Sequence, residues 1–332
     1  MAKKTVTIYD VANEAGVSMA TVSRVVNRNK NVKPETSKKV QEVIERLNYR
    51  PNEIARGLAS SRTTTIGVMI PNMTDFYYST LALGIDDIAS MYDYNVILEN
   101  SRKDSESEAS VLNSLLSKQV DGVIYMGLEF DDDIRQRFNQ SHTPVVLAGS
   151  IDPKNEFPSV NIDYRESTKK ASLNLLSKHE KVALVLSNQS APDGRQRLEG
   201  YKEAFDEVVK NYDPSFVYEV EDDYAAAYQF AEELIESGIE AVVTSSDEVG
   251  VGIMNRAVEL GKSIPDSFEI ITSHNTKITE MVRPTLSSIV EPTYDVGAVS
   301  MRLLTKLMDE EEIEEKEVIL PHNLVHRGTS VE

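Results

Sequence analysis

Apolar residues recur at helical spacing in the first 50 residues, which predicts a small bundle of three helices. The first helix ends near Ala15, where Gly16 permits a tight turn. The second runs from about Ser18, a good N-terminal cap, to Val26. The third begins near Pro34, a residue suited to the first turn of a helix. We expect the bundle to bury Val11, Ala12, Val22, Val25, Val40 and Ile44.

The pattern changes at Ile66, where short apolar runs typical of strands begin to alternate with longer helical stretches. The predicted strands are 66–70, 95–99, 122–125, 145–148, 159–162, 182–186, 216–219, 241–245, 269–272 and 286–290. The clearest predicted helices are 79–92, 105–118, 195–210, 224–237, 249–260 and 294–308. Such alternation indicates parallel sheets covered by helices, and its length indicates two similar lobes.

These patterns predict an α/β protein with an all-α helix-turn-helix headpiece followed by a two-lobed core with parallel sheets. A short segment around Asn52 could form two turns of helix, but Gly57 weakens it, so we interpret it as a hinge. The last helix and the strands after it should return across both lobes. The predicted units are residues 1–50 (headpiece), 51–65 (hinge and linker), 66–160 with 291–320 (first lobe), and 161–290 with 321–332 (second lobe).

Charge is distributed unevenly along the chain. The formal net charge is -19, yet residues 1–62 hold 12 Lys and Arg against 6 Asp and Glu. A basic head on an acidic body predicts that the head alone meets a polyanion such as DNA. The chain has no cysteine, no long apolar run and no secretory signal at its start. We therefore expect a cytoplasmic protein without disulfides, thiol catalysis or a membrane span.

The second predicted helix has the character of a recognition helix, which places polar side chains at its N-terminal end in the major groove. Arg24 could contact guanine through two hydrogen bonds, worth roughly 1–3 kcal/mol of discrimination. Met19 and Ala20 offer apolar contact to a thymine methyl group. The alternative is a solvated amphipathic helix with a surface arginine. The residues suited to phosphate are Ser18, Thr21, Ser23 and Asn27.

Residues 7–12, 17–27 and 48–52 resemble the helix-turn-helix region of the LacI–GalR family of bacterial repressors. The resemblance extends over essentially the full chain. It implies a homodimer whose hinge helices pair in the minor groove of a roughly palindromic operator, with Leu58 as the wedge that opens a base step. An ordinary buried hinge leucine is the alternative for Leu58. The further DNA-binding positions implied are Thr7, Tyr9, Tyr49, Asn52, Ala55 and Arg56.

The core resembles periplasmic sugar-binding proteins, as the cores of that family do. The effector positions that the family resemblance implies between the lobes are Gly149, Arg197, Ser246, Asp247 and His274. Sugar-responsive members usually carry a carboxylate at the positions of Gly149 and His274, so tight binding of a neutral sugar is not expected. Arg197 and His274 would instead favour an anion such as a phosphorylated sugar. The alternative is that these residues merely line the cleft.

The last predicted helix places Asp295, Val299, Arg302 and Lys306 on one face. An arginine and a lysine one turn apart form a good docking site for phosphate, although a solvated charged face is the plainer interpretation. Residues 18–24, 55–60, 86–92 and 294–306 are most similar to family members that serve carbon catabolite control in Gram-positive bacteria.

That closer resemblance implies a protein partner, the serine-phosphorylated form of the phosphocarrier HPr. It places Arg302 on the phosphoserine. The surrounding contacts that it implies are Asp87, Tyr92, Tyr294, Asp295 and Lys306.

No catalytic motif competes with this interpretation. The sequence has no Walker-type phosphate loop, no Gly-x-Ser-x-Gly and no His-Glu-x-x-His. His322 and His326 lie four apart, but no carboxylate accompanies them, so we expect no metal site.

We therefore predict a dimeric regulator of carbon catabolite control, with serine-phosphorylated HPr as corepressor. The alternatives are a sugar-responsive repressor of a single operon in the same family, a solute-binding transport protein and a sugar-metabolising enzyme. A transport protein would need an export signal and would have no use for a basic helix-turn-helix.

Overall fold

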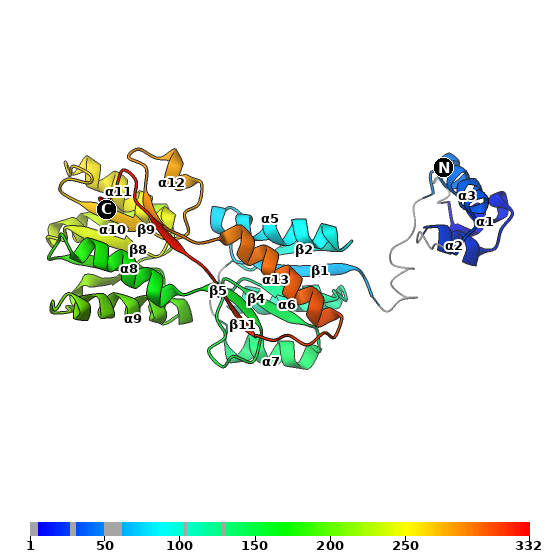
Figure 1. Ribbon diagram of the computed structural model, residues 1–332, viewed down its shortest axis with the longest axis horizontal. Coiled ribbons are helices and arrows are strands. Elements are labelled where there is room, and N and C mark those ends of the chain that lie inside the picture. The colour runs from blue at the N-terminus through cyan, green and yellow to red at the C-terminus, as the bar shows by residue number, and fades with distance from the viewer. Residues whose placement is uncertain (1–5, 27–30, 50–61, 103–104, 128–129) are drawn as a thin grey trace. The chain divides into compact units, whose positions relative to one another are not determined.

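The computed structural model describes residues 6–26, 31–49, 62–102, 105–127 and 130–332. The chain divides into two compact units, residues 1–63 and 64–332. We call the first unit the head and the second the core (Figure 1).

The head contains three helices, α1 (Ile8–Ala15), α2 (Met19–Val26) and α3 (Pro34–Leu47). The carboxylate of Asp10 accepts hydrogen bonds from the backbone N–H and the hydroxyl of Thr7, at 2.8 and 2.7 Å, and so fixes the start of α1. Gly16 ends α1 with φ 65°, a conformation that favours glycine. The hydroxyl of Ser18 accepts from the backbone N–H of Thr21 at 3.2 Å and caps α2. Gly16 and Ser18 thus end and begin the helices where the sequence analysis places those boundaries.

The core of the head is apolar and small. Five of the six predicted core residues are buried, and Ile44 is half-buried. Val43 takes its place among the buried residues. The buried residues of the head are Val11, Ala12, Ala15, Val22, Val25, Val40 and Val43.

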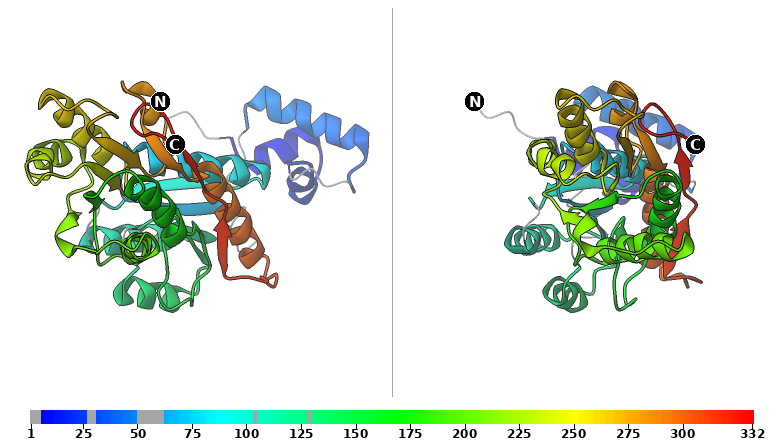
Figure 2. Two further views of the ribbon diagram at one scale, coloured as in Figure 1. Left: turned by 60° about the vertical axis from the view of Figure 1, so that its left-hand side comes forward. Right: turned by 90° about the vertical axis from the view of Figure 1, so that its left-hand side faces the viewer.

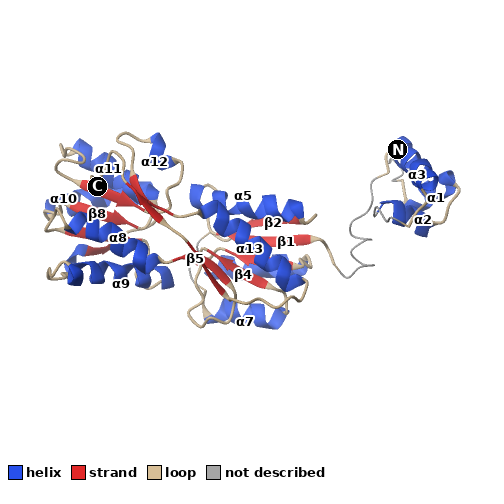
Figure 3. Ribbon diagram, viewed as in Figure 1, coloured by secondary structure: helices blue, strands red, loops and turns tan. Residues whose placement is uncertain are grey.

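The first lobe is built on a six-stranded, all-parallel sheet with strand order β11-β5-β4-β3-β1-β2. Helices α5 and α13 cover one face of this sheet, and α6 and α7 cover the other (Figures 1 and 3). Side chains alternate between the faces: Ile66 and Val68 of β1 pack against α5 and α13, whereas Met69 packs against α6 and α7. The strands are β1 (Thr65–Ile70), β2 (Asn95–Asn100), β3 (Gly122–Tyr125), β4 (Val145–Ala148), β5 (Ser159–Ile162) and β11 (Glu317–Leu320). The helices are α5 (Phe76–Met91), α6 (Ser105–Ser117), α7 (Asp132–Ser141) and α13 (Thr293–Met308).

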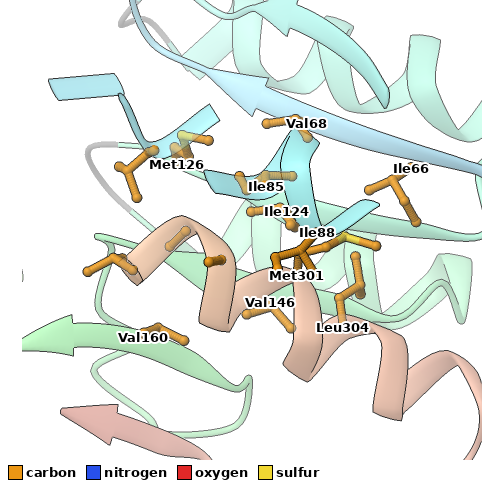
Figure 4. Close-up of a cluster of buried hydrophobic side chains, with 14 of the residues drawn as sticks. Ile66, Val68, Ile85, Ile88, Ile124, Met126, Val146, Val160, Met301 and Leu304 are labelled. Atoms are coloured by element: carbon orange, nitrogen blue, oxygen red, sulfur yellow. The ribbon is translucent and has the colours of Figure 1, made fainter. Parts of the chain in front are cut away.

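Figure 4 shows the apolar interior beneath α5 and α13. Ile88 of α5 and Met301 and Leu304 of α13 gather over strand residues such as Ile124 and Val146. The last long helix of the chain therefore completes the first lobe, although more than 100 residues separate it from β5.

The second lobe repeats this plan with strand order β12-β10-β9-β8-β6-β7, parallel except for the antiparallel β12. Helices α8 and α9 cover one face and α10 and α11 the other. The strands are β6 (Val182–Leu186), β7 (Val217–Glu219), β8 (Ala241–Thr244), β9 (Glu269–Thr272), β10 (Ser287–Val290) and β12 (Asn323–Val325). The helices are α8 (Tyr164–Leu176), α9 (Pro192–Glu207), the short 3-10 helix Pro214–Phe216, α10 (Tyr224–Glu236), α11 (Asp247–Glu259) and α12 (Ile278–Met281).

The chain crosses between the lobes three times: after β5, before α13 and between β11 and β12 (Figure 1). After α13 the chain returns across both lobes, since β11 joins the first sheet and β12 the second. β5 pairs with its neighbour as far as Ile162, two residues beyond the predicted limit of the first lobe at 160.

Three helices begin earlier than predicted, because each start carries a signal that the apolar periodicity does not show. α5 begins at Phe76, where the Asp75 carboxylate accepts from the backbone N–H of Tyr77 at 2.8 Å. α9 begins with Pro192 in its first turn, and α11 is capped by Ser246. Three helices of the core, α7, α8 and the one-turn α12, were not among those named from the sequence.

Candidate nucleic-acid interface, cleft and docking surface

The predicted recognition helix α2 exposes the face expected to meet DNA. Met19 is 40% exposed, and Ala20 and Arg24 are also exposed, whereas Val22 and Val25 are buried in the head. Within the described part of the head, no ion pair engages Arg24. Its guanidinium therefore keeps all its donors available to a nucleic acid.

The other predicted DNA-binding residues divide into three groups. Thr7, Ser18 and Tyr9 are exposed, with Tyr9 62% exposed. Thr21, Ser23 and Tyr49 are half-buried, and Tyr49 packs against the apolar core of the head. Asn27, Asn52, Ala55, Arg56 and Leu58 lie outside the described residues.

The two lobes enclose a cavity of about 60 Å³ in the core. Four of the five predicted effector residues line it: Gly149, Arg197, Ser246 and His274. Asp247 does not. Its carboxylate turns into the second lobe and accepts from the hydroxyl of Thr272 at 2.5 Å and from the backbone N–H of Thr276 at 2.7 Å. Burial raises the pKa of Asp247 to about 6.

Arg197 is buried and already partnered. Its guanidinium donates to Ser273 at 2.9 Å and to the carboxylate of Glu291 at 3.2 Å, and it lies 4.6 Å from the ring centre of Tyr164. Burial alone would lower the pKa of Arg197, but Glu291 and Asp193 raise it. Since carboxylates balance this cation, the cleft offers little attraction to an anion. Binding of a phosphorylated sugar in this cleft stays a prediction, and the carboxylates of Glu291 and Asp193 disfavour it.

Tyr77 is the cleft residue that the sequence analysis missed. It is 6% exposed, lines the cavity from α5, and stacks on His274 with ring centres 4.0 Å apart. Burial raises its pKa well above the usual value. The sequence does hold one signal for Tyr77, namely that Gly149 and His274 stand where sugar-responsive family members have a carboxylate. In the structure, Gly149 lies beside the Tyr77 hydroxyl and His274 stacks on the Tyr77 ring.

The predicted docking surface lies on α5 and α13, which run side by side on the first lobe (Figures 1 and 2). Arg302 and Lys306 are exposed, and neither forms an ion pair within the described residues. Asp295 is exposed, and Val299, predicted on the same face, is half-buried. The arrangement leaves two cations one turn apart and open to solvent.

The α5 side of this surface is held to the α13 side. The hydroxyl of Tyr294 donates to the carboxylate of Asp87 at 2.8 Å, and this carboxylate raises the pKa of Tyr294. Tyr92, just past the end of α5, is 49% exposed. Two apolar side chains of α5, Leu83 and Met91, are 54% and 73% exposed. All six predicted docking residues are therefore exposed, around an apolar margin that the sequence analysis did not include.

Comparison with known families identifies both units. Residues 7–52 match the model of the bacterial regulatory proteins of the lacI family, and residues 63–319 match that of periplasmic binding proteins and the sugar binding domain of the LacI family. The chain belongs to the LacI family. The fold class and family predicted from the sequence are thereby confirmed.

This LacI family member has close relatives along its whole length. It is 50% identical over 331 residues to Catabolite control protein A of Streptococcus mutans, and the matched region covers 98% of each chain. The transcription regulator CcpA of Lactococcus lactis is 42% identical, with a TM-score of 0.79 over 81% of this chain and 100% of that one. The lac repressor dimer bound to operator and the anti-inducer ONPF is 25% identical, with a TM-score of 0.89 over 99% of this chain and 100% of that one.

The relatives are regulators, so this LacI family protein is a regulator and not an enzyme. In the described parts of the chain, no three His, Asp or Glu side chains come together as metal ligands. No described helix combines the length and apolarity needed to cross a bilayer.

Proposed function

We propose that the protein binds pseudo-palindromic DNA operators as a dimer, regulates genes of carbon catabolism, and uses serine-phosphorylated HPr as corepressor. The observation that carries this proposal is the pair Arg302 and Lys306, exposed and unpaired among the described residues of α13. The relatives named catabolite control protein support the same assignment.

DNA binding is supported by the charge and exposure of the head. Its face presents Arg24, Met19 and Ala20, and its helices are capped and packed without them. The excess of Lys and Arg in residues 1–62 favours phosphate, whereas the acidic core stays away from it. A dimer places two such faces on two half-sites, which requires a symmetric operator.

A pair of arginine variants tests base recognition by the head. Arg24→Ala removes an exposed cation expected to contact a base and should weaken operator binding by about ten- to a hundredfold. Arg46→Ala removes the same charge from α3, where Arg46 pairs with Glu14 at 2.8 Å, and serves as the matched control. Affinity measured over a range of salt should fall steeply for the unaltered protein. Equal losses in both variants would mean that Arg24 acts only as a charge.

Docking of the phosphoprotein is supported by the chemistry of α13. A phosphoserine carries close to two negative charges and three acceptor oxygens, which suit a guanidinium and an ammonium one turn apart. The exposed Leu83 and Met91 provide apolar contact around that charged centre. A hydrogen bond from the hydroxyl of Tyr294 on α13 to the carboxylate of Asp87 on α5 joins the two helices at this surface.

Titration of the full-length protein with HPr tests the docking surface. Arg302→Ala should weaken binding of serine-phosphorylated HPr by at least about tenfold, because a charge-assisted hydrogen bond is lost. Arg137→Ala removes the same charge from α7 of the same lobe, where Arg137 pairs with Asp133, and should bind normally. Unchanged affinity in Arg302→Ala would overturn this part of the proposal.

A further inference from the structure

The cleft between the lobes contains a side chain where a small effector would lie. Tyr77 projects from the first turn of α5 in the first lobe and is almost completely buried. We propose that Tyr77 is a built-in occupant of the cleft, which latches the two lobes together without a small ligand. This inference concerns the core alone and does not depend on the proposed DNA or protein partner.

The contacts of Tyr77 reach across to the second lobe. Its ring stacks on that of His274, with ring centres 4.0 Å apart and planes 23° apart. Tyr164, the first residue of α8 in the second lobe, lines the same cavity as Tyr77. Beside it, the ammonium of Lys277 lies 4.2 Å from the ring centre of Phe76. Phe76 and Tyr77 of the first lobe thus both contact the second lobe through aromatic rings.

Gly149 makes room for this occupant. It adopts φ +66°, and a β-carbon added there would lie 2.5 Å from the hydroxyl oxygen of Tyr77. A residue with a β-carbon at this position would therefore require the Tyr77 side chain to move. The two positions that lack an expected carboxylate, Gly149 and His274, are thus the two that accommodate Tyr77.

The loop that carries His274 is held in a strained conformation. His274 and Asn275 adopt φ angles of 85° and 54°, a region that non-glycine residues rarely occupy. Two hydrogen bonds fix this loop to the rest of the second lobe. The backbone N–H of Thr276 donates to the carboxylate of Asp247 at 2.7 Å, and that of Asn275 donates to the hydroxyl of Ser288 at 3.1 Å. Such strain persists only where the surroundings fix it. Here it presents the imidazole to Tyr77.

Little space remains around the occupant. The cavity of about 60 Å³ compares with several hundred Å³ for a typical ligand pocket, so it has room for a few water molecules only. A sugar-sized effector would have to displace Tyr77. The closed state that an effector would stabilise is therefore already stabilised by the chain itself.

Hydrogen exchange of the full-length protein, with no DNA or partner present, tests the latch. Tyr77→Ala should speed exchange about tenfold in residues 272–277 of the second lobe, because an aromatic pair is lost. Tyr77→Phe keeps the ring and should exchange nearly as the unaltered protein does. Tyr224→Ala, a tyrosine of α10 that does not line the cleft, is the matched control. Unchanged exchange of 272–277 in Tyr77→Ala would overturn the proposal.

Two further variants keep the test decisive if Tyr77→Ala does not fold. Gly149→Ala should speed exchange in 272–277 in the same way, because its β-carbon meets the Tyr77 hydroxyl. The double variant Gly149→Ala/Tyr77→Phe lacks that oxygen, and the nearest ring atom is then 3.4 Å away, so protection should be largely restored. Equal exchange in the single and double variants would show that Gly149 does not act through Tyr77.

Discussion

Gly84 of α5 and Gly297 of α13 lie where the two helices touch. A β-carbon on Gly84 would lie 2.1 Å from the carbonyl oxygen of Tyr294, and one on Gly297 would lie 2.1 Å from that of Leu81. The two helices therefore meet backbone to backbone. Because neither can slide without collision, their relative register is fixed, and the proposed docking surface that they share is a rigid unit.

Gly297→Ala should destabilise the core by about 2 kcal/mol or more, because the added methyl group cannot be accommodated by a backbone oxygen. The sign is diagnostic, since glycine to alanine in an unhindered helix stabilises it. Thermal unfolding of the core measures the effect, and Ser90→Ala on the exposed face of α5 is the control. A variant as stable as the unaltered protein would show that the helices can separate freely.

Tyr294→Phe should lower affinity for serine-phosphorylated HPr by about threefold while leaving thermal stability unchanged. The variant loses the hydrogen bond to Asp87 and leaves that carboxylate free to move on the docking surface. Calorimetric titration gives the affinity. If Tyr294→Phe bound as tightly as the unaltered protein, the hydrogen bond would have no part in docking.

Asp247→Asn should change how stability depends on pH. The pKa of Asp247 is about 6 in the folded chain, against 3.8 for an ordinary aspartate. Between pH 3.8 and 6, the Asp247 carboxyl is therefore protonated in the folded chain and ionised in the unfolded chain. Between these two values the group's contribution to stability falls as pH rises, by about 3 kcal/mol in total. The asparagine variant cannot ionise and should lack this decline.

Unfolding measured between pH 4 and 7 checks this difference of slopes. Asp266→Asn, which removes an exposed carboxyl from the same lobe, is the matched control. Parallel pH profiles for Asp247→Asn and the unaltered protein would mean that Asp247 is not held protonated by burial.

Much of the fold follows from local patterns in the sequence. β3, β4, β5, β6 and β9 begin and end at the predicted residues. The apolar runs of β3, β4 and β6 are buried on both faces, which gives a clear signal in parallel sheets. Helix α13 is also recognisable from the sequence, because its buried face carries large apolar residues such as Met301 and Leu304 at helical spacing.

The sequence analysis missed helices that bury polar side chains or few large apolar ones, and a residue whose contacts are distant along the chain. The buried face of α8 includes Thr168 and Ser172, so apolar periodicity does not reveal this helix. α7 buries only two large apolar residues, Ile134 and Phe138. Tyr77 occupies the cleft through contacts with residues nearly 90 to 200 positions away, which no local pattern encodes.

The decisive measurement is the operator affinity of the full-length protein, with and without serine-phosphorylated HPr, at one fixed salt concentration. The phosphorylated partner should tighten operator binding by about tenfold, as expected for a coupling between two sites, and unphosphorylated HPr should not. If the operator affinity were the same with phosphorylated HPr, with unphosphorylated HPr and with neither, HPr would not be the corepressor of this protein.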